Sequence, residues 1–287
     1  LRLFNKNWHN YKQFDAVFAF TPTQIYYYHQ QGLNQSIYMP GHLYYEPRDI
    51  TPAKLENKNL VMIGRPSPEK RYRLAIEALP YIIKEIPDCK LTIVSNVDPH
   101  LVKLAKKLNV SEHLIFTGFQ NDVHKFLVNA SIYLLLSDYE SYCYALAEAK
   151  AFGLANINTE KQYLVLTQNG TININNDSPK SIANECIKLL KNQTYLNEQG
   201  RLARESLEPF NYQYVNERYY SVMMSLVNNT FNKLAQDEYE KINITKQDII
   251  LKEEFELLKR RKSKLYGCMN YTSLFQLIEK LIIKPCS

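Results

Sequence analysis

From residue 59 onward the chain alternates short apolar runs with longer segments whose apolar residues recur at helical spacing. The first run, Leu-Val-Met-Ile at residues 60–63, is continuously apolar, as a strand covered on both faces would be. Residues 71–86 follow it with a broad apolar stripe at the helical period. Strands that alternate with helices form right-handed βαβ units with parallel strands. The sequence therefore predicts an α/β fold with a doubly wound parallel sheet.

The same alternation continues toward residue 190. Further strands are expected at residues 90–94, 114–116, 132–136, 154–157 and 171–174. Further helices are expected at residues 99–108, 122–128, 142–152 and 179–190. Ligands of such sheets bind beyond the carboxyl ends of the strands. The loops after residues 63, 116 and 136 lie at that edge, so a ligand site is predicted there.

The chain is expected to have three parts. Residues 1–50 contain two short strands, at residues 16–20 and 37–39, which are too little for a separate domain. Residues 51–228 hold the predicted sheet and form a Rossmann-like domain. Residues 229–287 change character and are predicted to form a helical carboxyl-terminal extension.

The bulk composition is that of a folded globular protein. Hydrophobic residues make up 45% and charged residues 22% of the 287 positions, close to ordinary values. The formal net charge of +6 is mild for this length. A nucleic-acid binder would show a basic stripe interleaved with stacking aromatic residues, and no such stripe stands out. A nucleic-acid partner is therefore not expected.

Cysteine usage and hydropathy indicate the compartment. The five cysteines are scattered and form no CxxC pair, so neither a zinc site nor a disulfide framework is predicted. Reduced cysteines fit the cytosol. No apolar run approaches the ~20 residues that span a bilayer, and no signal peptide begins the sequence. A cytoplasmic location is predicted.

The extension contains the ingredients of a peripheral membrane anchor. Residues 259–264 carry five cations in six positions, and residues 273–284 form a short, very apolar helix. Basic residues beside an apolar helix bind anionic lipid, which would place the protein at the inner face of the membrane. The same helix also suits packing against the body of the protein, with its cations solvated. Both interpretations remain open.

The first motif with chemical content is the loop Gly-Arg-Pro-Ser-Pro-Glu-Lys at residues 64–70, between a predicted strand and a predicted helix. It is not a phosphate-binding Walker loop, because the second glycine and the Lys-Ser/Thr pair are missing. It places Arg65 and Lys70 at the carboxyl edge of the sheet. Two cations there suit a diphosphate, although the loop alone is equally well explained as a solvated basic segment.

The second motif occupies residues 138–148. Glu140 ends a strand-to-helix loop, and Ser141 is a good N-cap residue. The backbone N–H groups that follow, around Tyr142 to Tyr144, then form an anion site at the helix start. Glu148 lies two turns further on, where an acid accepts hydrogen bonds from a ribose diol in dinucleotide-binding folds. Taken alone, two glutamates at helical spacing are usually surface residues.

The order GRPSPEK, KLTIVS, HLIFTGF, SDYESYCYALAEAKAFGL resembles the carboxyl domain of glycosyltransferase family 4, over residues 15–227. That family carries the signature E-x7-E, which Glu140 and Glu148 match. The resemblance implies a GT-B fold in which this chain supplies the donor site. It also implies that an amino-terminal acceptor-binding domain is missing from this chain, with residues 1–50 as its remnant.

The resemblance assigns roles to individual residues. Arg65 and Lys70 match the cations that hold and stabilise the leaving diphosphate, next to Gly64. Glu140 matches the acid beside the donor sugar, and Glu148 the acid that binds the ribose. The segment around the diphosphate and donor sugar is matched by Ser141, Tyr142 and Cys143. Phe119 lies where the family's base-binding loop begins.

The implied reaction is transfer of a hexose, with retention, from a nucleotide sugar such as UDP-hexose to a glycan, glycolipid or glycoprotein. The resemblance also implies that the reaction needs no metal or other cofactor. Two departures from its pattern are present: the Gly-Gly-x-x-Glu stretch after residues 154–157 is missing, and Cys143 replaces a glycine. The alternatives are a non-catalytic nucleotide-sugar-binding or partner module, and a basic protein that binds membranes or nucleic acids.

Overall fold

The structure of the chain is a computed structural model, which describes residues 11–138, 140, 142–159, 165–167, 169–174 and 176–242. Its larger lobe is built on a parallel sheet with the strand order β5-β4-β3-β6-β7-β8. The strands are β3 (Asn59–Ile63), β4 (Lys90–Val94), β5 (Leu114–Phe116), β6 (Ile132–Leu135), β7 (Ala155–Asn158) and β8 (Ile172–Asn173). All four residues of β6 are buried, as expected for a central parallel strand.

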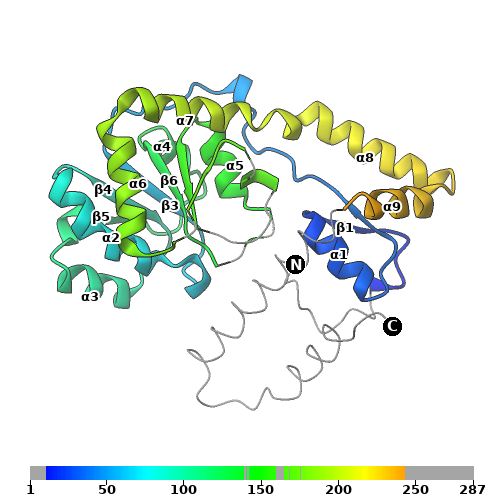
Figure 1. Cartoon of the computed structure of the whole chain (residues 1–287), viewed down its shortest axis with the longest axis horizontal. Helices are drawn as coiled ribbons and strands as arrows, with labels where there is room; N and C mark the ends of the chain where they lie inside the picture. Colours follow the sequence, from blue (N-terminus) through cyan, green and yellow to red (C-terminus); the bar gives the residue numbers. More distant parts are fainter. Residues whose placement is uncertain are drawn as a thin grey trace, which may run out of the picture.

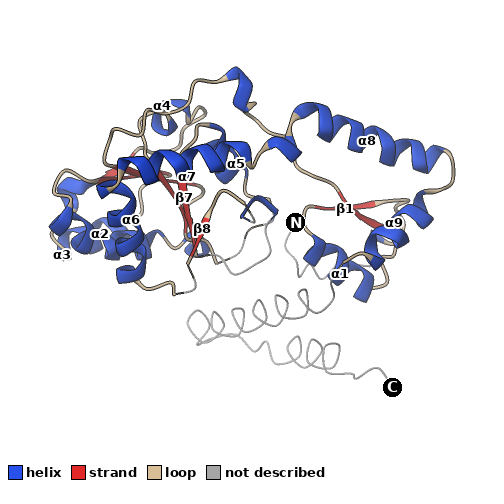
Figure 2. Ribbon diagram, turned by 45° about the horizontal axis from the view of Figure 1, so that its top comes forward, coloured by secondary structure: helices blue, strands red, loops and turns tan. Residues whose placement is uncertain are grey.

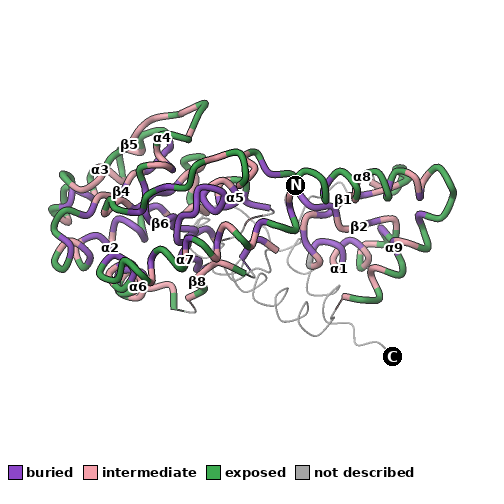
Figure 3. The backbone as a smooth tube through the Cα atoms, turned by 90° about the horizontal axis from the view of Figure 1, so that it is seen from above, coloured by how far each residue is buried: buried purple, intermediate pink, exposed green. Residues whose placement is uncertain are grey.

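Helices lie between these strands or follow the last of them, and they pack around the sheet (Figure 1). They are α2 (Tyr72–Glu85), α3 (Pro99–Lys107), α4 (His124–Leu127), α5 (Tyr144–Ala151), α6 (Pro179–Lys191) and α7 (Gln193–Glu205). Helix α2 shows the basis of the pattern, because its residues at helical spacing, among them Ile76, Leu79 and Ile82, are fully buried. Figure 3 shows this burial concentrated along the sheet and the inner sides of the helices. The predicted α/β fold with a parallel sheet is confirmed.

Two predicted helices start later than expected. Helix α4 begins at His124, after Asp122 has accepted a hydrogen bond of 2.9 Å from the His124 backbone N–H. This local bond competes with helix geometry, and it explains why residue 122 lies outside the helix. Helix α5 begins at Tyr144, two residues later than predicted.

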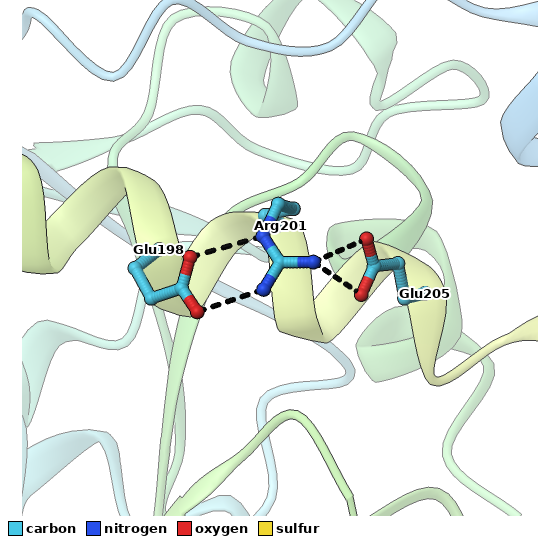
Figure 4. A network of polar contacts seen from close by, with 3 residues as sticks. All are labelled: Glu198, Arg201 and Glu205. Atoms are coloured by element: carbon cyan, nitrogen blue, oxygen red, sulfur yellow. Dashed lines mark hydrogen bonds and ion pairs between the residues drawn. The ribbon is translucent and has the colours of Figure 1, made fainter.

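Helix α7 was not predicted, and its outer face is held by charge pairs. Arg201 lies between Glu198 and Glu205, at 2.8 and 2.5 Å (Figure 4). Such exposed pairs at i,i+3 and i,i+4 stabilise a helix by ~0.5 kcal/mol each. The network therefore supports α7 locally and has no part in the candidate site.

A smaller lobe combines both ends of the described chain, as Figure 2 shows. Its elements are β1 (Val17–Ala19), α1 (Pro22–Gln30), β2 (Ser36–Tyr38), α8 (Tyr212–Val227) and α9 (Phe231–Glu240). Strands β1 and β2 pair in parallel. Ile37 and Met39 are buried together with Val222 of α8 and Phe231 of α9. Helix α9, the first helix of the predicted extension, thus packs on the segment predicted as a remnant.

Residues 243–287, with the predicted basic run and apolar helix, lie outside the described residues. Their proposed membrane contact therefore stays a prediction. Among the helices that the structure describes, none has the length and apolar character needed to cross a membrane. The division of the chain at residues 50 and 228 also stays a prediction.

Candidate functional site

The segments that follow β3, β6 and β8 meet at the carboxyl edge of the large sheet. The Asp138 backbone N–H, just after β6, donates to the Glu69 carbonyl oxygen at 2.8 Å. Arg71, at the start of α2, contacts Asp138 at 3.4 Å and Asp177 at 2.7 Å. Its side chain is only 20% exposed. Arg71 therefore ties three strand ends together at the predicted ligand edge.

Lys70 and Glu140, both predicted site residues, are in direct contact. Lys70 Nζ lies 2.5 Å from Glu140 Oε1, and Ser137 Oγ donates to the same oxygen at 2.6 Å. The two side chains are 18% and 13% exposed. Burial alone would lower the pKa of Lys70, but the nearby Cys143 and Glu140 outweigh it and raise that pKa. Lys70 is therefore held as a cation at the sheet edge.

Gly64 lies against this lysine. A Cβ added at Gly64 would stand 2.9 Å from Lys70 Cε and 3.2 Å from the Tyr72 hydroxyl. A side chain there would require the Lys70 side chain to shift. The structure thus gives Gly64 a role in the close approach of the loop to Lys70.

Arg65 takes no part in the contacts that the structure describes around Lys70 and Glu140. It is exposed, and within the described parts of the chain it makes no hydrogen bond or ion pair. It belongs to the same loop as Gly64 and Lys70, at the same edge of the sheet. An exposed guanidinium at this edge keeps all its donors available for an anion.

The start of α5 differs from the predicted cap. The N-cap residue is Cys143, with φ of 67° in the left-handed region and no side-chain cap hydrogen bond. The predicted cap, Ser141, lies outside the described residues. The backbone N–H groups of Tyr144 and Ala145 stand in the first helical turn, where an α-helix offers no acceptor of its own. The predicted anion site at this helix start stays a prediction, and the helix boundary makes residues 144 and 145 the candidates for its N–H groups.

Tyr142 has a structural contact that the sequence did not reveal. Its side chain is 3% exposed, and its hydroxyl donates to the Gly41 carbonyl oxygen at 2.9 Å. The ring also packs 5.8 Å from Phe20 and 6.1 Å from Phe210, between centroids. The Tyr142 side chain thus joins the segment before α5 to the chain that follows β2.

Glu148 lies on α5 in a half-buried cluster. Burial, and secondarily the charge of Asp122, raise the pKa of Glu148 to about 7. Asp122 Oδ1 accepts a hydrogen bond of 3.2 Å from the Tyr45 hydroxyl. The Tyr45 ring packs edge-on to Phe152 at 5.2 Å and to His124 at 6.3 Å. Neither Tyr45 nor Asp122 was predicted as a site residue. Tyr45 reaches this cluster from a segment with no periodic sequence signal.

Phe119 stands on the loop after β5. Its side chain is 74% exposed, and its backbone N–H donates to Asn96 Oδ1 at 3.1 Å. Asn96 follows β4, so the loops after two neighbouring strands are joined at this edge. The exposed ring offers a flat apolar surface, which is compatible with the predicted role beside a base.

Comparisons with curated proteins give two relatives. The N-acetyl-alpha-D-glucosaminyl L-malate synthase of Bacillus anthracis is 29% identical over 175 residues, covering 57% of this chain and 45% of that protein. An uncharacterized glycosyltransferase of Haemophilus influenzae is 34% identical over 104 residues, covering 36% of this chain and 30% of that protein. The matched part spans less than half the length of each relative.

Solved structures share the fold at low sequence identity. A mutant of S. aureus TarM, in complex with fondaparinux, alpha-GlcNAc-glycerol and UDP, superposes with a TM-score of 0.66 at 20% identity, covering 78% of this chain and 45% of TarM. The pneumococcal O-GlcNAc transferase GtfA, in complex with UDP and GlcNAc, superposes with a TM-score of 0.65 at 18% identity, covering 78% of this chain and 47% of GtfA. HepE of Anabaena, in complex with UDP, superposes with a TM-score of 0.63 at 12% identity, covering 74% of this chain and 64% of HepE.

The family profile described as "Glycosyl transferases group 1" matches residues 46–206, which is more than half of this chain of 287 residues. The matched range contains the large sheet and every predicted site residue. The structural neighbours have the GT-B type of fold. The chain therefore belongs to the glycosyl transferases group 1 family.

Proposed function

We propose that this chain supplies the donor site of a glycosyltransferase, and that the diphosphate of a UDP-hexose binds at the carboxyl edge of the large sheet. The observation that carries the proposal is the convergence there of Lys70, Arg65 and the first turn of α5 on the described sheet edge. Positive charge and backbone N–H donors at a helix start are the groups that bind phosphates in proteins.

The proposed chemistry is cleavage of the bond between the sugar and the β-phosphate. Charge develops on the leaving phosphate oxygen, and prepositioned cations and N–H groups stabilise it, each by ~3 kcal/mol. Lys70 is already held at the edge by Glu140, so it is oriented before the donor arrives. These groups supply the positive charge that a metal ion would otherwise provide, and we propose a reaction that needs no metal.

Glu140 and Glu148 serve different parts of the donor in this proposal. Glu140, bound to Lys70, lies beside the sugar. Glu148, further along α5, accepts hydrogen bonds from the ribose hydroxyls. Retention of the anomeric configuration and a glycan, glycolipid or glycoprotein acceptor follow the family resemblance, and we assign no catalytic nucleophile.

UDP binding by the chain itself tests the proposal. Arg65→Ala removes an exposed guanidinium from the site without disturbing a packed contact, so it should weaken UDP binding at least about tenfold, or ~1.4 kcal/mol. Isothermal titration calorimetry measures the difference. Arg73→Ala is the matched control, because Arg73 is an exposed arginine on α2 that pairs with Glu77. Equal UDP affinity in wild type and the Arg65 variant would overturn the site.

A further inference from the structure

A pocket of about 930 Å³ opens on the small lobe, away from the large sheet. Its walls come from the segment before β1, the turn before β2, and the turn between α8 and α9 with the residues around it. None of the residues that line it belongs to the loops of the donor site. Its volume falls within the usual range for sites that bind small ligands, roughly 300–1,000 Å³.

Among the eleven described residues that line this pocket, five carry a carboxamide side chain. Asn34, Asn229 and Asn232 are exposed, and their side chains form no hydrogen bond with other residues that the structure describes. Gln35 is fixed in the wall, because its Nε2 donates to the Tyr11 and Phe14 carbonyl oxygens at 3.3 and 3.2 Å. Each carboxamide offers both donors and an acceptor in one plane. The pocket thus presents several mixed donor and acceptor groups to a ligand.

The charge of the lining is balanced. Among the described residues of the lining, one cation, Lys12, is offset by one anion, Asp15. An anionic ligand would therefore gain little net attraction in this pocket. The lining also includes apolar surface, because the Phe14 ring is 53% and Val227 is 71% exposed.

We propose that this pocket is a second carbohydrate site, which binds a neutral oligosaccharide. Sugar hydroxyls both donate and accept hydrogen bonds, which matches carboxamides better than it matches charged groups. The C–H face of a pyranose ring is apolar and packs on an exposed aromatic ring such as Phe14. The site is independent of the donor site, and it would hold a glycan on the small lobe while a nucleotide occupies the sheet edge.

Saturation-transfer difference NMR with two defined neutral probes, maltotetraose and chitotetraose, tests this site. At least one probe should receive saturation from the protein and titrate with a dissociation constant on the order of millimolar. Tetragalacturonate, a charged oligosaccharide of the same length, should bind at least about fivefold more weakly, a difference of ~1 kcal/mol. Excess UDP should leave the sugar signals unchanged.

Matched variants locate the binding. Phe14→Ala and Asn232→Ala should each weaken sugar binding at least about fivefold, or ~1 kcal/mol. Asn216→Ala is the control, since Asn216 is an exposed asparagine on α8 that does not line the pocket. Arg65→Ala should leave sugar binding intact even though it weakens UDP binding, so failure of either site is separately visible.

Three outcomes would overturn the proposal. The first is a lack of saturation transfer to both neutral probes, and the second is sugar binding that neither pocket variant changes. The third is a concentration-dependent dimer that Phe14→Ala disperses in sedimentation velocity, which would assign the surface to a second copy of the chain.

Discussion

At the scale of single residues, the two glutamates of the E-x7-E signature have different surroundings. Glu140 is paired with Lys70 and accepts from Ser137, so its charge is compensated. Glu148 has a pKa raised to about 7 by burial and by the charge of Asp122. Its protonation state therefore changes near neutral pH. This matters for the proposed site, because the ribose hydroxyls donate hydrogen bonds and the carboxylate form of Glu148 is the better acceptor.

This difference predicts a pH dependence of UDP binding. Below about pH 7 Glu148 is largely protonated in the empty site, and above it the carboxylate is present. UDP affinity should therefore rise between about pH 6 and about pH 8 in wild type. Glu148→Gln should bind UDP at least about tenfold more weakly at the higher pH, or ~1.4 kcal/mol, because it removes the charged acceptor.

Calorimetry at both pH values measures this effect. UDP itself titrates in the same range, so only the difference in slope between wild type and Glu148→Gln reports on Glu148. Glu140→Gln is the comparison variant and should lose less UDP affinity than Glu148→Gln, because we place Glu140 at the sugar and a glutamine can still accept a hydrogen bond from Lys70. Equal slopes in wild type and Glu148→Gln, or a greater loss of UDP affinity in Glu140→Gln, would show that the two roles are misassigned.

At the scale of elements, Gly41 and Tyr142 form the contact between the segment after β2 and the start of α5. A Cβ at Gly41 would lie 2.6 Å from Tyr142 Cε1. The tyrosine ring cannot easily yield, because it is buried against Phe20 and Phe210. This close approach depends on the glycine.

Gly41→Ala should therefore reduce the free energy of unfolding by ~1–3 kcal/mol, the usual cost of overpacking a buried contact. Tyr142→Phe, which removes only the hydrogen bond to the Gly41 carbonyl oxygen, should cost ~1 kcal/mol. Chemical denaturation followed by circular dichroism measures both. Wild-type stability in Gly41→Ala would show that the two segments do not meet as described.

Helix α5 also carries a buried lysine, Lys150, which is 0% exposed. Its Nζ donates to the Asn169 carbonyl oxygen at 2.5 Å and to Ser206 Oγ at 2.9 Å, beyond the end of α7. Burial lowers the pKa of Lys150 to about 7. In the unfolded chain the same group titrates near ~10.4.

The sign of the resulting pH effect follows from proton counting. Between about pH 7 and about pH 10 the unfolded chain holds a proton on Lys150 that the folded protein lacks, so stability rises with pH from this group. Lys150→Met should remove that contribution. Chemical denaturation of both proteins near pH 7.5 and pH 9.5 measures the free energy of unfolding. Between these two pH values that free energy should rise less, or fall more, in the variant than in wild type. Identical pH dependence would contradict a neutral buried lysine.

Much of the large lobe was predictable because its signals are local. Residues 60–63 and 132–136 are continuously apolar, and the helices between strands have clear apolar stripes. The start of α5 was not predictable in the same way. Ser141 has the chemistry of a cap, yet the helix begins after Cys143 in a left-handed conformation that a cysteine rarely adopts. The neighbouring Tyr142 is buried and bonded to Gly41, a long-range contact that the local sequence does not reveal.

At the scale of the whole molecule, the two strands of the small lobe were predicted, at residues 16–20 and 37–39, and they form β1 and β2. Their assembly with α8 and α9 was not predicted, because these contacts join residues that are remote in sequence. Arg218 donates to the Tyr38 carbonyl oxygen at 2.8 Å across a separation of 180 residues. The same arginine pairs with Glu238 of α9. Helices α8 and α9 therefore complete a lobe whose assembly cannot be predicted from local sequence patterns.

This arrangement places two chemically different surfaces on one chain. The edge of the large sheet gathers cations and helix N–H groups, which suit a diphosphate. The small lobe carries a charge-balanced, carboxamide-lined pocket, which suits a neutral glycan. The hydrogen bond from Tyr142 to Gly41 joins the segment before α5 to the segment that follows β2.

The central claim is the location of the donor diphosphate, and a crystal structure of this chain with UDP bound tests it most directly. The account predicts phosphate oxygens within hydrogen-bond distance of Lys70 Nζ, the Arg65 guanidinium and the first-turn N–H groups of α5, with the ribose hydroxyls at Glu148. UDP bound away from the carboxyl edge of the large sheet, or at that edge with its ribose at Glu140, would contradict the account.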